Sequence, residues 1–535
     1  FIRGSESDHV LVLIDGVEAN STTTGAFDFA HLTTENVERI EILRGSGGTL
    51  YGSQAIGGVI HIITKAGKGR PEITVSGEGG NGHTHRQVFA LRGGTEKLGY
   101  SFAGSRLETD GFRPFNDDYQ NLAASNRLDF RPTDSTVLRG VFHFRKTDVG
   151  LFSNNNFLGI PDPNARENVT DYLAKFDWEQ RLNRSWDYRL TGSFFNQYDK
   201  FSDDPEPSSF DVRRHNRFRA RALTGEFQTN YRWQEWSTTT FGFEYKSRQA
   251  RTDTIRERQG NLAYYLQQQL SFLGERLFLV GGVRLDDHEV FGTEWSPSAS
   301  AAYVIPESGT KFKFGYAEGF KAPTMNELFF PGFGNPNLGP ETSWEANMGI
   351  EQKFLRLFLV GVTYFHREVK DLIEFAPPTF QARNLGKVQL DGIEVFGDFN
   401  LGRGLSGRTA YTFLNSQTST GSLLRRPKHR GNVQLTYQQD SFHINFNASL
   451  VGKRDDIGVL TGATVKEAGY VKLDLASSWT LPWQFAGVRD LSLFGKVENL
   501  LDRKYEEADG FRARPLNFLI GIRAVLQIDK QGGAR

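Results

Sequence analysis

The chain contains no cysteine. This absence excludes disulfides, thiol catalysis and thiolate metal sites together, and it fits an oxidising compartment in which a free thiol would be a liability. No stretch supplies the 18 or more consecutive apolar residues that a membrane-spanning helix needs. The formal net charge is zero, so nothing in the charge balance favours a nucleic-acid partner.

Catalytic motifs are missing as well. Neither G-x-S-x-G nor H-E-x-x-H occurs in the chain, so two common hydrolase signatures are absent. The glycine-rich run at residues 45–49 leads into Leu50 and Tyr51, where a phosphate-binding loop needs Lys followed by Ser or Thr. We expect the small residues there to allow close packing instead. The sequence predicts a protein that is not an enzyme and uses no catalytic cofactor.

The abundant residues point to β-structure in an unusual setting. Aromatic residues make up 13% of the chain, with 44 Phe, and 57 Gly stand against only 18 Pro. The mean hydropathy is −0.46, which alone would suggest a soluble protein. Long stretches nevertheless alternate apolar and polar residues. A membrane barrel with a wet interior needs this combination, because only every second residue of each strand touches lipid.

The chain divides into two regions of different texture near residue 70. Residues 1–70 carry apolar residues in blocks, such as 10–14 and 59–63, which is typical of strands buried on both faces. From about Glu72 onward, two-residue alternation continues almost to the end. We expect the first region to be a domain of its own and residues 71–528 to form the barrel, followed by a tail at 529–535.

The clearest strand of the second region spans residues 442–450, which read FHINFNASL. Phe446 and its even-numbered neighbours form an apolar face, whereas Asn445 and the other odd-numbered residues form a polar one. The length suits a tilted strand that crosses a bilayer. Trp186 begins a similar strand and is predicted to lie at the periplasmic rim, where aromatic residues gather.

The connections between strands alternate in length. Short ones, such as 132–135 and 273–276, contrast with long polar loops predicted at 151–168 and 199–216. Short turns on one side and long loops on the other are typical of outer-membrane barrels. A soluble propeller or sandwich would alternate too, but a propeller should repeat every 40–50 residues or so, and no such repeat occurs. A barrel of about 22 strands fits the length, and its lumen would be wide enough to need a plug.

Short motifs then give a specific resemblance. Three lie in the first region and read VLIDGV (12–17), VERIEILRG (37–45) and LYGSQAIGGVIHIIT (50–64). The others read FKAP (320–323), NPNLGPET (335–342), NLG (384–386), LDGIE (390–394) and ENLLDRKY (498–505). Together they resemble the TonB-dependent outer-membrane receptors, closest to the cobalamin (vitamin B12) receptor branch.

The resemblance covers essentially the whole chain and implies a fold and a function. It implies an all-β fold, a transmembrane antiparallel barrel whose lumen holds residues 1–70 as the C-terminal half of a plug domain. It also implies a bacterial outer-membrane location, contact with outer-membrane lipid, and a TonB-type energy-coupling protein as partner. The favoured function is active import of cobalamin or a related corrinoid. The alternatives are a ferric-siderophore receptor and, from another class, a passive porin-like or structural barrel.

The two ends of the chain depart from the family pattern. The chain begins at Phe1 without a signal peptide, and the first half of the plug and the TonB box are not in it, so we expect the natural N-terminus to lie further upstream. Family members usually finish on an aromatic residue, whereas this chain continues through residues 529–535 to Arg535. Either the tail is an extension or the final strand is atypical.

The substrate-binding residues are predicted at the apex of the plug. In the resembling receptors the loop equivalent to residues 20–28 reaches the extracellular mouth and touches substrate. Its hydroxyls and its aromatic ring suit a large ligand rich in amides, although an ordinary solvated loop would look similar. The predicted set, which includes a neighbouring apical position, is Ser5, Ser7, Asp8, Asn20, Ser21, Thr22, Thr23, Thr24, Phe27 and Asp28.

Two further sets of charged residues are candidates, one for a calcium site and one for contacts between the plug and the barrel. Carboxylates in the predicted external loops could hold a structural calcium ion, since calcium prefers clustered carboxylate oxygens and the resembling cobalamin receptors order their loops with calcium. These residues are Asp117, Asp118, Asp203, Asp204, Glu206 and Asp211. The charges at 38, 39, 41 and 44 alternate in sign. They could pair across a plug–barrel seam that breaks under pulling, or they could simply pair at a surface.

Overall fold

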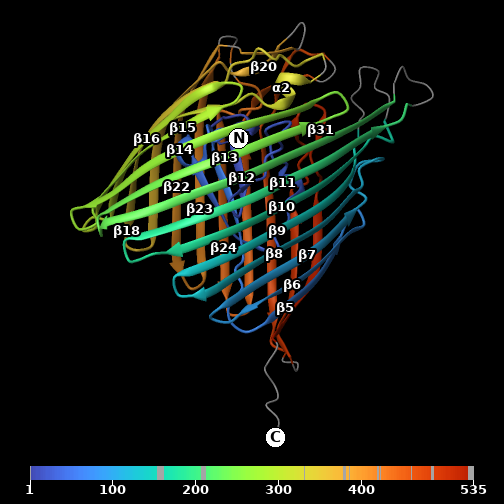
Figure 1. The fold of residues 1–535 in the computed structure, drawn as a ribbon. Coiled ribbons are helices and arrows are strands. Elements are labelled where there is room, and N and C mark those ends of the chain that lie inside the picture. The colour runs from blue at the N-terminus through green and yellow to red at the C-terminus, as the bar shows by residue number, and fades with distance from the viewer. Residues whose placement is uncertain are drawn as a thin grey trace.

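Figure 1 shows a wide antiparallel barrel with the N-terminal residues inside its lumen. The computed structural model describes residues 2–152, 162–205, 213–330, 332–376, 381–384, 386–418, 421, 423–458, 461–483 and 487–527. Within these residues 22 strands close into the barrel, which confirms the predicted fold class. Among them, no helix is long and apolar enough to cross a membrane.

The N-terminal domain, which we call the plug, is built around a small mixed sheet of order β2-β1-β4-β3. Strand β1 pairs in parallel with β4 and antiparallel with β2, while β3 pairs antiparallel with β4. The apolar blocks read from the sequence form its core, because Leu11, Leu13, Ala55 and Val59 pack together. The elements are η1 Ser7–His9, β1 Val10–Ile14, β2 Val17–Glu18, η2 Phe29–His31, β3 Val37–Arg44, α1 Gly48–Tyr51 and β4 Gly58–Thr64.

The barrel begins at β5, immediately after the plug, and closes where the last strand β32 pairs with β5. Its first eleven strands are β5 Glu72–Gly80, β6 Thr84–Gly94, β7 Leu98–Thr109, β8 Tyr119–Thr133, β9 Thr136–Gly150, β10 Arg166–Arg181, β11 Trp186–Asp203, β12 Arg214–Gln234, β13 Ser237–Arg251, β14 Arg256–Phe272 and β15 Leu277–His288. The others are β16 Gly292–Ile305, β17 Thr310–Lys321, β18 Glu341–Phe354, β19 Phe358–Lys370, β22 Lys387–Gly402, β23 Leu405–Gln417, β24 His429–Gln439, β25 Phe442–Val451, β28 Tyr470–Leu481, β29 Val488–Glu498 and β32 Asn517–Gln527.

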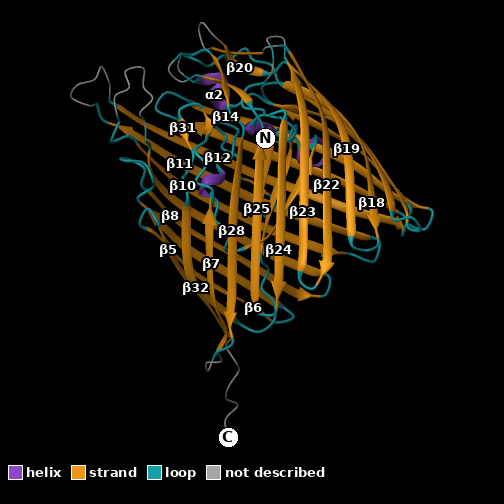
Figure 2. Cartoon of the chain, turned by 180° about the vertical axis from the view of Figure 1, so that it is seen from behind, coloured by secondary structure: helices purple, strands orange, loops and turns teal. Residues whose placement is uncertain are grey.

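Long connections gather at one end of the barrel and short turns at the other, as Figure 2 shows. The long-loop end carries its own small elements: α2 Met325–Phe329, β20 Ile373–Ala376, β21 Gln381–Asn384, β26 Arg454–Ile457, β27 Thr464–Glu467, β30 Glu506–Ala508 and β31 Phe511–Arg512. The predicted loops 151–168 and 199–216 are shorter than expected. Strands β10, β11 and β12 continue their pairing into them, from Arg166 against Ser202 to Asp203 against Arg214.

The predicted alternation of faces holds in β25. Phe442 and Leu450 are 40% and 42% exposed on the outward face, which is also the face of Phe446. Asn445, on the other face, donates a hydrogen bond to Thr436 of the neighbouring strand. Trp186 is exposed at the short-turn end of β11. The described part of the last strand ends at Gln527, so the predicted tail 529–535 lies outside the described residues.

Candidate functional site at the plug apex and the plug–barrel seam

Charged side chains join the plug to the barrel wall, and we call these contacts the seam. Arg3 of the plug is buried and pairs with Glu394 of β22 at 2.8 Å and with Glu345 of β18. Arg44, at the end of β3, reaches the same Glu394 at 3.2 Å. Arg367 of β19 also binds Glu345 and donates to the carbonyl oxygen of Gly57 in the plug at 3.1 Å. Three arginines therefore share two carboxylates.

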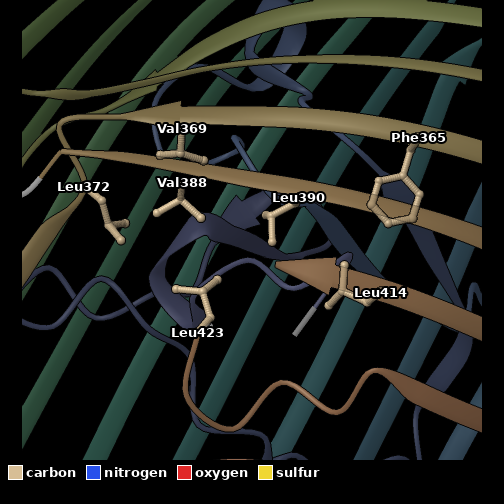
Figure 3. Packing of buried hydrophobic residues seen from close by; sticks show 7 residues of the cluster. All are labelled: Phe365, Val369, Leu372, Val388, Leu390, Leu414 and Leu423. Atoms are coloured by element: carbon tan, nitrogen blue, oxygen red, sulfur yellow. The ribbon is translucent and has the colours of Figure 1, made fainter. Parts of the chain in front are cut away.

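An apolar cluster lies beside this group, on the lumen side of β19, β22 and β23 (Figure 3). The guanidinium of Arg3 stacks over the ring of Phe365, 4.6 Å from its centroid. At Gly4 an added Cβ would meet a methyl of Leu414 at 2.8 Å, and the backbone φ is +78°. Glycine is therefore required for this close approach. Here the plug is wedged against apolar side chains as well as held by charge.

A second buried group surrounds Lys321, the last residue of β17. Its ammonium contacts Asp8 of the plug at 2.8 Å, Glu341 of β18 at 2.9 Å and Glu327 of α2 at 3.2 Å. His9 of the plug lies 2.8 Å from the other oxygen of Glu341. Burial alone would lower the pKa of His9, but the carboxylate of Glu341 outweighs it and raises that pKa. The protonated form of His9 is therefore favoured by its contact with Glu341.

Two further carboxylates of the plug contact basic side chains of the wall. Asp15 accepts from Thr64 and lies 3.0 Å from the ring nitrogen of His143 on β9. Glu18 pairs with Arg248 at 2.9 Å and with Lys246 at 3.0 Å, both on β13. Burial would raise the pKa of Glu18, but these two cations outweigh it and lower the pKa to about 2.

Sequence reasoning placed the seam elsewhere in the plug. Of the four charges predicted there, Arg44 reaches the wall, whereas Arg39 and Glu41 are exposed and pair with each other at 2.6 Å. The wall partners were missed altogether. They share one signal, because Glu341 and Glu345 both fall on the lumen-facing side of their strand, where polar residues recur at every second position. Which residues of the plug pair with these two glutamates depends on how the strand is positioned against the plug, and the sequence does not show this.

The predicted apical loop is mostly packed rather than open. Asn20 is 1% exposed and ties the loop together: its amide donates to the carbonyls of Val10 and Gly25, and its oxygen accepts from the Val12 amide. Thr23 accepts from the backbone of Asn326 in α2. The buried members of the predicted set are Ser5, Asn20, Ser21, Thr22 and Thr23. A ligand could reach them only if neighbouring segments moved.

The accessible part of the apex is smaller and more aromatic than expected. Ser7, Thr24 and Asp28 are exposed, and Phe27 is half-buried. Phe29, which was not predicted, is 47% exposed and stacks edge-on against Phe27 at 4.9 Å. The remaining predicted residue, Asp8, is committed to Lys321.

The predicted calcium ligands have other contacts. Asp117 accepts from the backbone of Phe112 at 2.7 Å, Asp118 binds Arg166 at 2.6 Å, and Asp204 binds Arg213 at 2.8 Å. Asp203 is buried at the end of β11, and Glu206 and Asp211 lie outside the described residues. In the described part of the chain, the one group of three carboxylates within 4.8 Å of each other is Glu467, Glu506 and Asp509. Sequence reasoning missed this group, since its members come from two separate loops.

A polar cavity of about 790 Å³ lies between the plug and strands β8–β14 toward the short-turn end. Its wall carries Arg139, Lys175, Arg189 and Glu226 among many amides and hydroxyls, and the plug contributes Asp15 and His61. The plug thus fills the long-loop side of the lumen more closely than this side. Water in such a cavity can solvate the charges of the seam when they separate.

Comparisons with known proteins agree with this architecture. A family model described as "TonB dependent receptor-like, beta-barrel" matches residues 99–500, and one described as "TonB-dependent Receptor Plug Domain" matches residues 1–59. The vitamin B12 transporter BtuB of Photobacterium profundum is 26% identical over 97% of this chain and 84% of its own length. The BtuB protein of Vibrio vulnificus is 27% identical over 95% and 82%.

Solved structures of siderophore receptors share the fold. A mutant of the ferric enterobactin receptor PfeA of Pseudomonas aeruginosa superimposes with a TM-score of 0.81, covering 98% of this chain and 91% of its own at 19% identity. The siderophore receptor PirA of the same organism gives a TM-score of 0.75, covering 98% and 93% at 22% identity. At these identities the likeness concerns the fold.

Proposed function

The chain belongs to the TonB-dependent receptor family, and from this premise we propose that it imports a corrinoid such as cobalamin across the bacterial outer membrane. It is a receptor and transporter, not an enzyme. In the proposed cycle the ligand binds at the long-loop end above the plug, and a TonB-type protein supplies the pull that opens the lumen. The observation that carries this proposal is a folded plug joined to the barrel by ion pairs such as Arg3–Glu394 and Glu18–Arg248.

The seam suits a plug that must be held firmly and still be movable. Buried ion pairs have large Coulomb energies but also large desolvation costs, so their net contribution to stability is modest while both partners stay together. Separating them into water restores their hydration. Apolar contacts must be broken as well, such as those of the cluster in which Val17 and Ile14 of the plug pack against Leu173, Phe195 and Ala222 of the wall. A pull on the plug therefore meets local resistance from both ion pairs and apolar contacts.

The accessible side chains of the apex favour a neutral ligand rich in amides over an anionic ligand. Phe27 and Phe29 offer aromatic surface, and Thr24 and Ser7 offer hydroxyls. No Lys or Arg occurs between Asp8 and His31. An anionic siderophore would bind more tightly to a site with cations, because these can make charge-assisted hydrogen bonds. The curated relatives named vitamin B12 transporter support the same choice.

A ferric siderophore is the alternative substrate. The siderophore receptors among the solved structures share the fold, and cations of the outer loops could bind such a ligand. Two of these cations are poorly disposed to do so. Arg213 pairs with Asp204, and Arg217 shares the outward register of Leu223 on β12, away from the lumen. This arrangement favours the corrinoid.

Direct binding to the purified protein decides between the two substrates. We expect cyanocobalamin to bind, and a panel of ferric siderophores to bind weakly or not at all. Replacing Phe27 and Phe29 with alanine should weaken cyanocobalamin binding about tenfold or more, since each ring contributes roughly 0.5–1.5 kcal/mol beyond its buried area. Arg39→Ala, at an exposed pair, is the matched control. Tight siderophore binding without measurable corrinoid binding would overturn the substrate and leave the transporter intact.

Passage of small solutes tests the transporter itself against a passive porin. The barrel, reconstituted in vesicles without an energy source, should not release small sugars, because the plug occupies the lumen. Rapid release of sugars from such vesicles would contradict the proposal of an active importer.

A further inference from the structure

A second polar cavity lies in the lumen where the last barrel strand pairs with the first. Its volume is about 380 Å³, and it is bounded by plug residues 34–36 and 65 and by strands β5, β6, β7, β29 and β32. We call it the closure cavity. Five cations and three carboxylates line it, namely Lys65, Arg86, Arg92, Arg489 and Arg523 with Glu35, Glu72 and Glu78. The lining therefore carries two positive charges in excess.

The three carboxylates of the closure cavity are engaged by three of its cations. The ion pairs are those of Glu72 with Arg92 at 2.7 Å and with Arg489 at 2.5 Å, and those of Arg86 with Glu78 at 3.2 Å and with Glu35. Asp490, just outside the cavity, adds a second contact to Arg489 at 2.7 Å. Among the residues that the structure describes, Lys65 and Arg523 have no carboxylate within ion-pair distance. These two cations are the ones that an added anion would offset.

Arg523 of β32 points into the lumen, and an aromatic ring supports it there. Ile520 and Ile522 of the same strand are exposed on the outward face, so Arg523 lies on the opposite face. Its guanidinium lies over the ring of Phe494, 5.1 Å from the centroid. That ring fills the space beside Gly521, where an added Cβ would meet it at 2.5 Å. In the described part of the chain, the N–H groups of Arg523 have no hydrogen-bond acceptor and can bind a ligand.

Lys65 brings the second cation to the cavity from the plug. Its ammonium donates to the carbonyl oxygen of Glu35 at 3.1 Å. Burial lowers the pKa of Lys65, and the positive charges of Arg92 and Arg523 lower it further. Lys65 and Arg523 are therefore close enough to repel each other, and an anion between them would relieve this repulsion. The hydroxyl of Ser76, directly opposite Arg523 on β5, also lines the cavity.

We propose that the closure cavity binds a phosphate group, which joins Lys65 of the plug to Arg523 of the wall. The planar fork of a guanidinium matches the oxygens of a phosphate, and charge-assisted hydrogen bonds of this kind are strong. The two excess positive charges match a phosphate near neutral pH. Free inorganic phosphate and the phosphodiester of a corrinoid offer the same chemistry. The site lies in the lumen, away from the plug apex, and goes beyond the proposed import.

Calorimetric titration of the whole protein with inorganic phosphate, in a neutral detergent and a phosphate-free buffer, tests the proposal. Arg523→Gln and Lys65→Gln should each weaken binding about tenfold or more, since each removes a charge-assisted hydrogen bond. Two controls remove cations from other parts of the lumen. Lys311→Gln changes a wall cation in a different cavity, and Arg39→Gln changes an exposed plug cation. Both controls should bind phosphate as the parent does. Absence of binding, or equal loss in all four variants, would overturn the site.

Hydrogen exchange shows whether the bound anion joins plug to wall. Phosphate should slow the exchange of plug amides around residues 34–36 and 65 in the parent and in Lys311→Gln, but not in Arg523→Gln. Phosphate binding without this protection would overturn the bridging role. If Arg523→Gln fails to fold, Lys65→Gln should still lose both the binding and the protection.

Competing anions identify the ligand class and its source. At equal ionic strength sulfate should displace phosphate and chloride should not; displacement by chloride would show unspecific attraction and overturn the assignment. Displacement by dimethyl phosphate would support a phosphodiester carried by a larger ligand, whereas its failure to displace would support free phosphate, and both results support the site. Cyanocobalamin binding at the apex should be unchanged in Arg523→Gln, so failure of the phosphate site leaves the proposed function untouched.

Discussion

The barrel wall and the plug–barrel seam are held together by different kinds of interaction. Adjacent strands of the wall join through continuous backbone ladders, such as the pairing of β10 with β11 from Arg166 to Arg181. The seam joins through side chains, for instance at Lys321, Glu18 and Asp15. A ladder must be broken along its whole length, whereas side-chain ion pairs can be separated one at a time and solvated. The wall is therefore expected to keep its shape while the plug moves.

Among the predicted effects, the largest should come from removing a shared carboxylate of the seam, which should destabilise the plug much more than the wall. Glu345→Ala leaves Arg3 and Arg367 buried near each other without their common partner, and breaking a buried pair costs about 3–5 kcal/mol. We expect faster hydrogen exchange of plug amides with little change in the wall. Glu41→Ala, at an exposed pair, should leave the hydrogen exchange of the plug nearly unchanged, because exposed ion pairs contribute little to stability. Equal protection of the plug amides against hydrogen exchange in the two variants would show that the seam does not hold the plug.

The next largest effect should be a difference in stability between two variants that place a charge on opposite faces of the same wall strand. Phe446→Arg puts a cation into the apolar outward face near the middle of β25, at a cost of about 2–4 kcal/mol. Asn445→Arg puts the same charge into the wet lumen and should be tolerated. Unfolding in urea from lipid vesicles measures both. Similar destabilisation by the two variants would contradict the assigned faces.

Asn20→Ala tests whether the apical loop is a packed structure. The variant leaves the Val12 amide and the carbonyls of Val10 and Gly25 without their buried partner, which costs roughly 1–3 kcal/mol. We expect loosening of residues 20–28 in proteolysis and hydrogen exchange. Thr24→Ala, at the exposed tip of the same loop, should leave the loop protected. A loop unchanged by Asn20→Ala would return this residue to a purely ligand-binding role.

The smallest expected effects come from pH, and they have opposite signs at two points of the seam. Because the pKa of Glu18 falls from 4.5 to about 2 on folding, its contribution is present above pH 4.5 and is lost as the pH falls toward 2. Because the pKa of His9 is raised above 6.5, its contribution is present below pH 6.5 and is lost as the pH rises through the raised value.

Plug protection measured by hydrogen exchange, corrected for intrinsic rates, should therefore weaken at both extremes of pH. Glu18→Gln should remove the acid limb and His9→Gln the alkaline limb. A limb that persists in its own variant would assign the titration to another group.

The sequence predicted the barrel because alternation is a local property that each strand carries in itself, as in residues 442–450. It predicted the plug because block-like strands such as 10–14 and 59–63 differ from the wall. It could not predict which apical residues are accessible. Ser21, Thr22 and Thr23 look like an open polar loop, but α2 and β13 cover them. Nor could it pair Lys321 with Asp8, because these residues lie far apart in the chain and meet only where the plug docks against the wall.

The most direct test of a movable plug in a fixed wall is a pair of engineered disulfides, which the absence of native cysteine makes possible. The hydroxyls of Thr49 in the plug and Ser298 in the wall lie 2.9 Å apart, so Thr49→Cys with Ser298→Cys can link the two regions. Thr480→Cys with Ser492→Cys, at hydroxyls 3.1 Å apart, links two strands of the wall. In cells that carry the protein, we predict that oxidation of the first pair abolishes cyanocobalamin uptake and that reduction restores it, while the second pair has no effect. Uptake at the parental rate with the plug–wall disulfide fully formed would contradict the account.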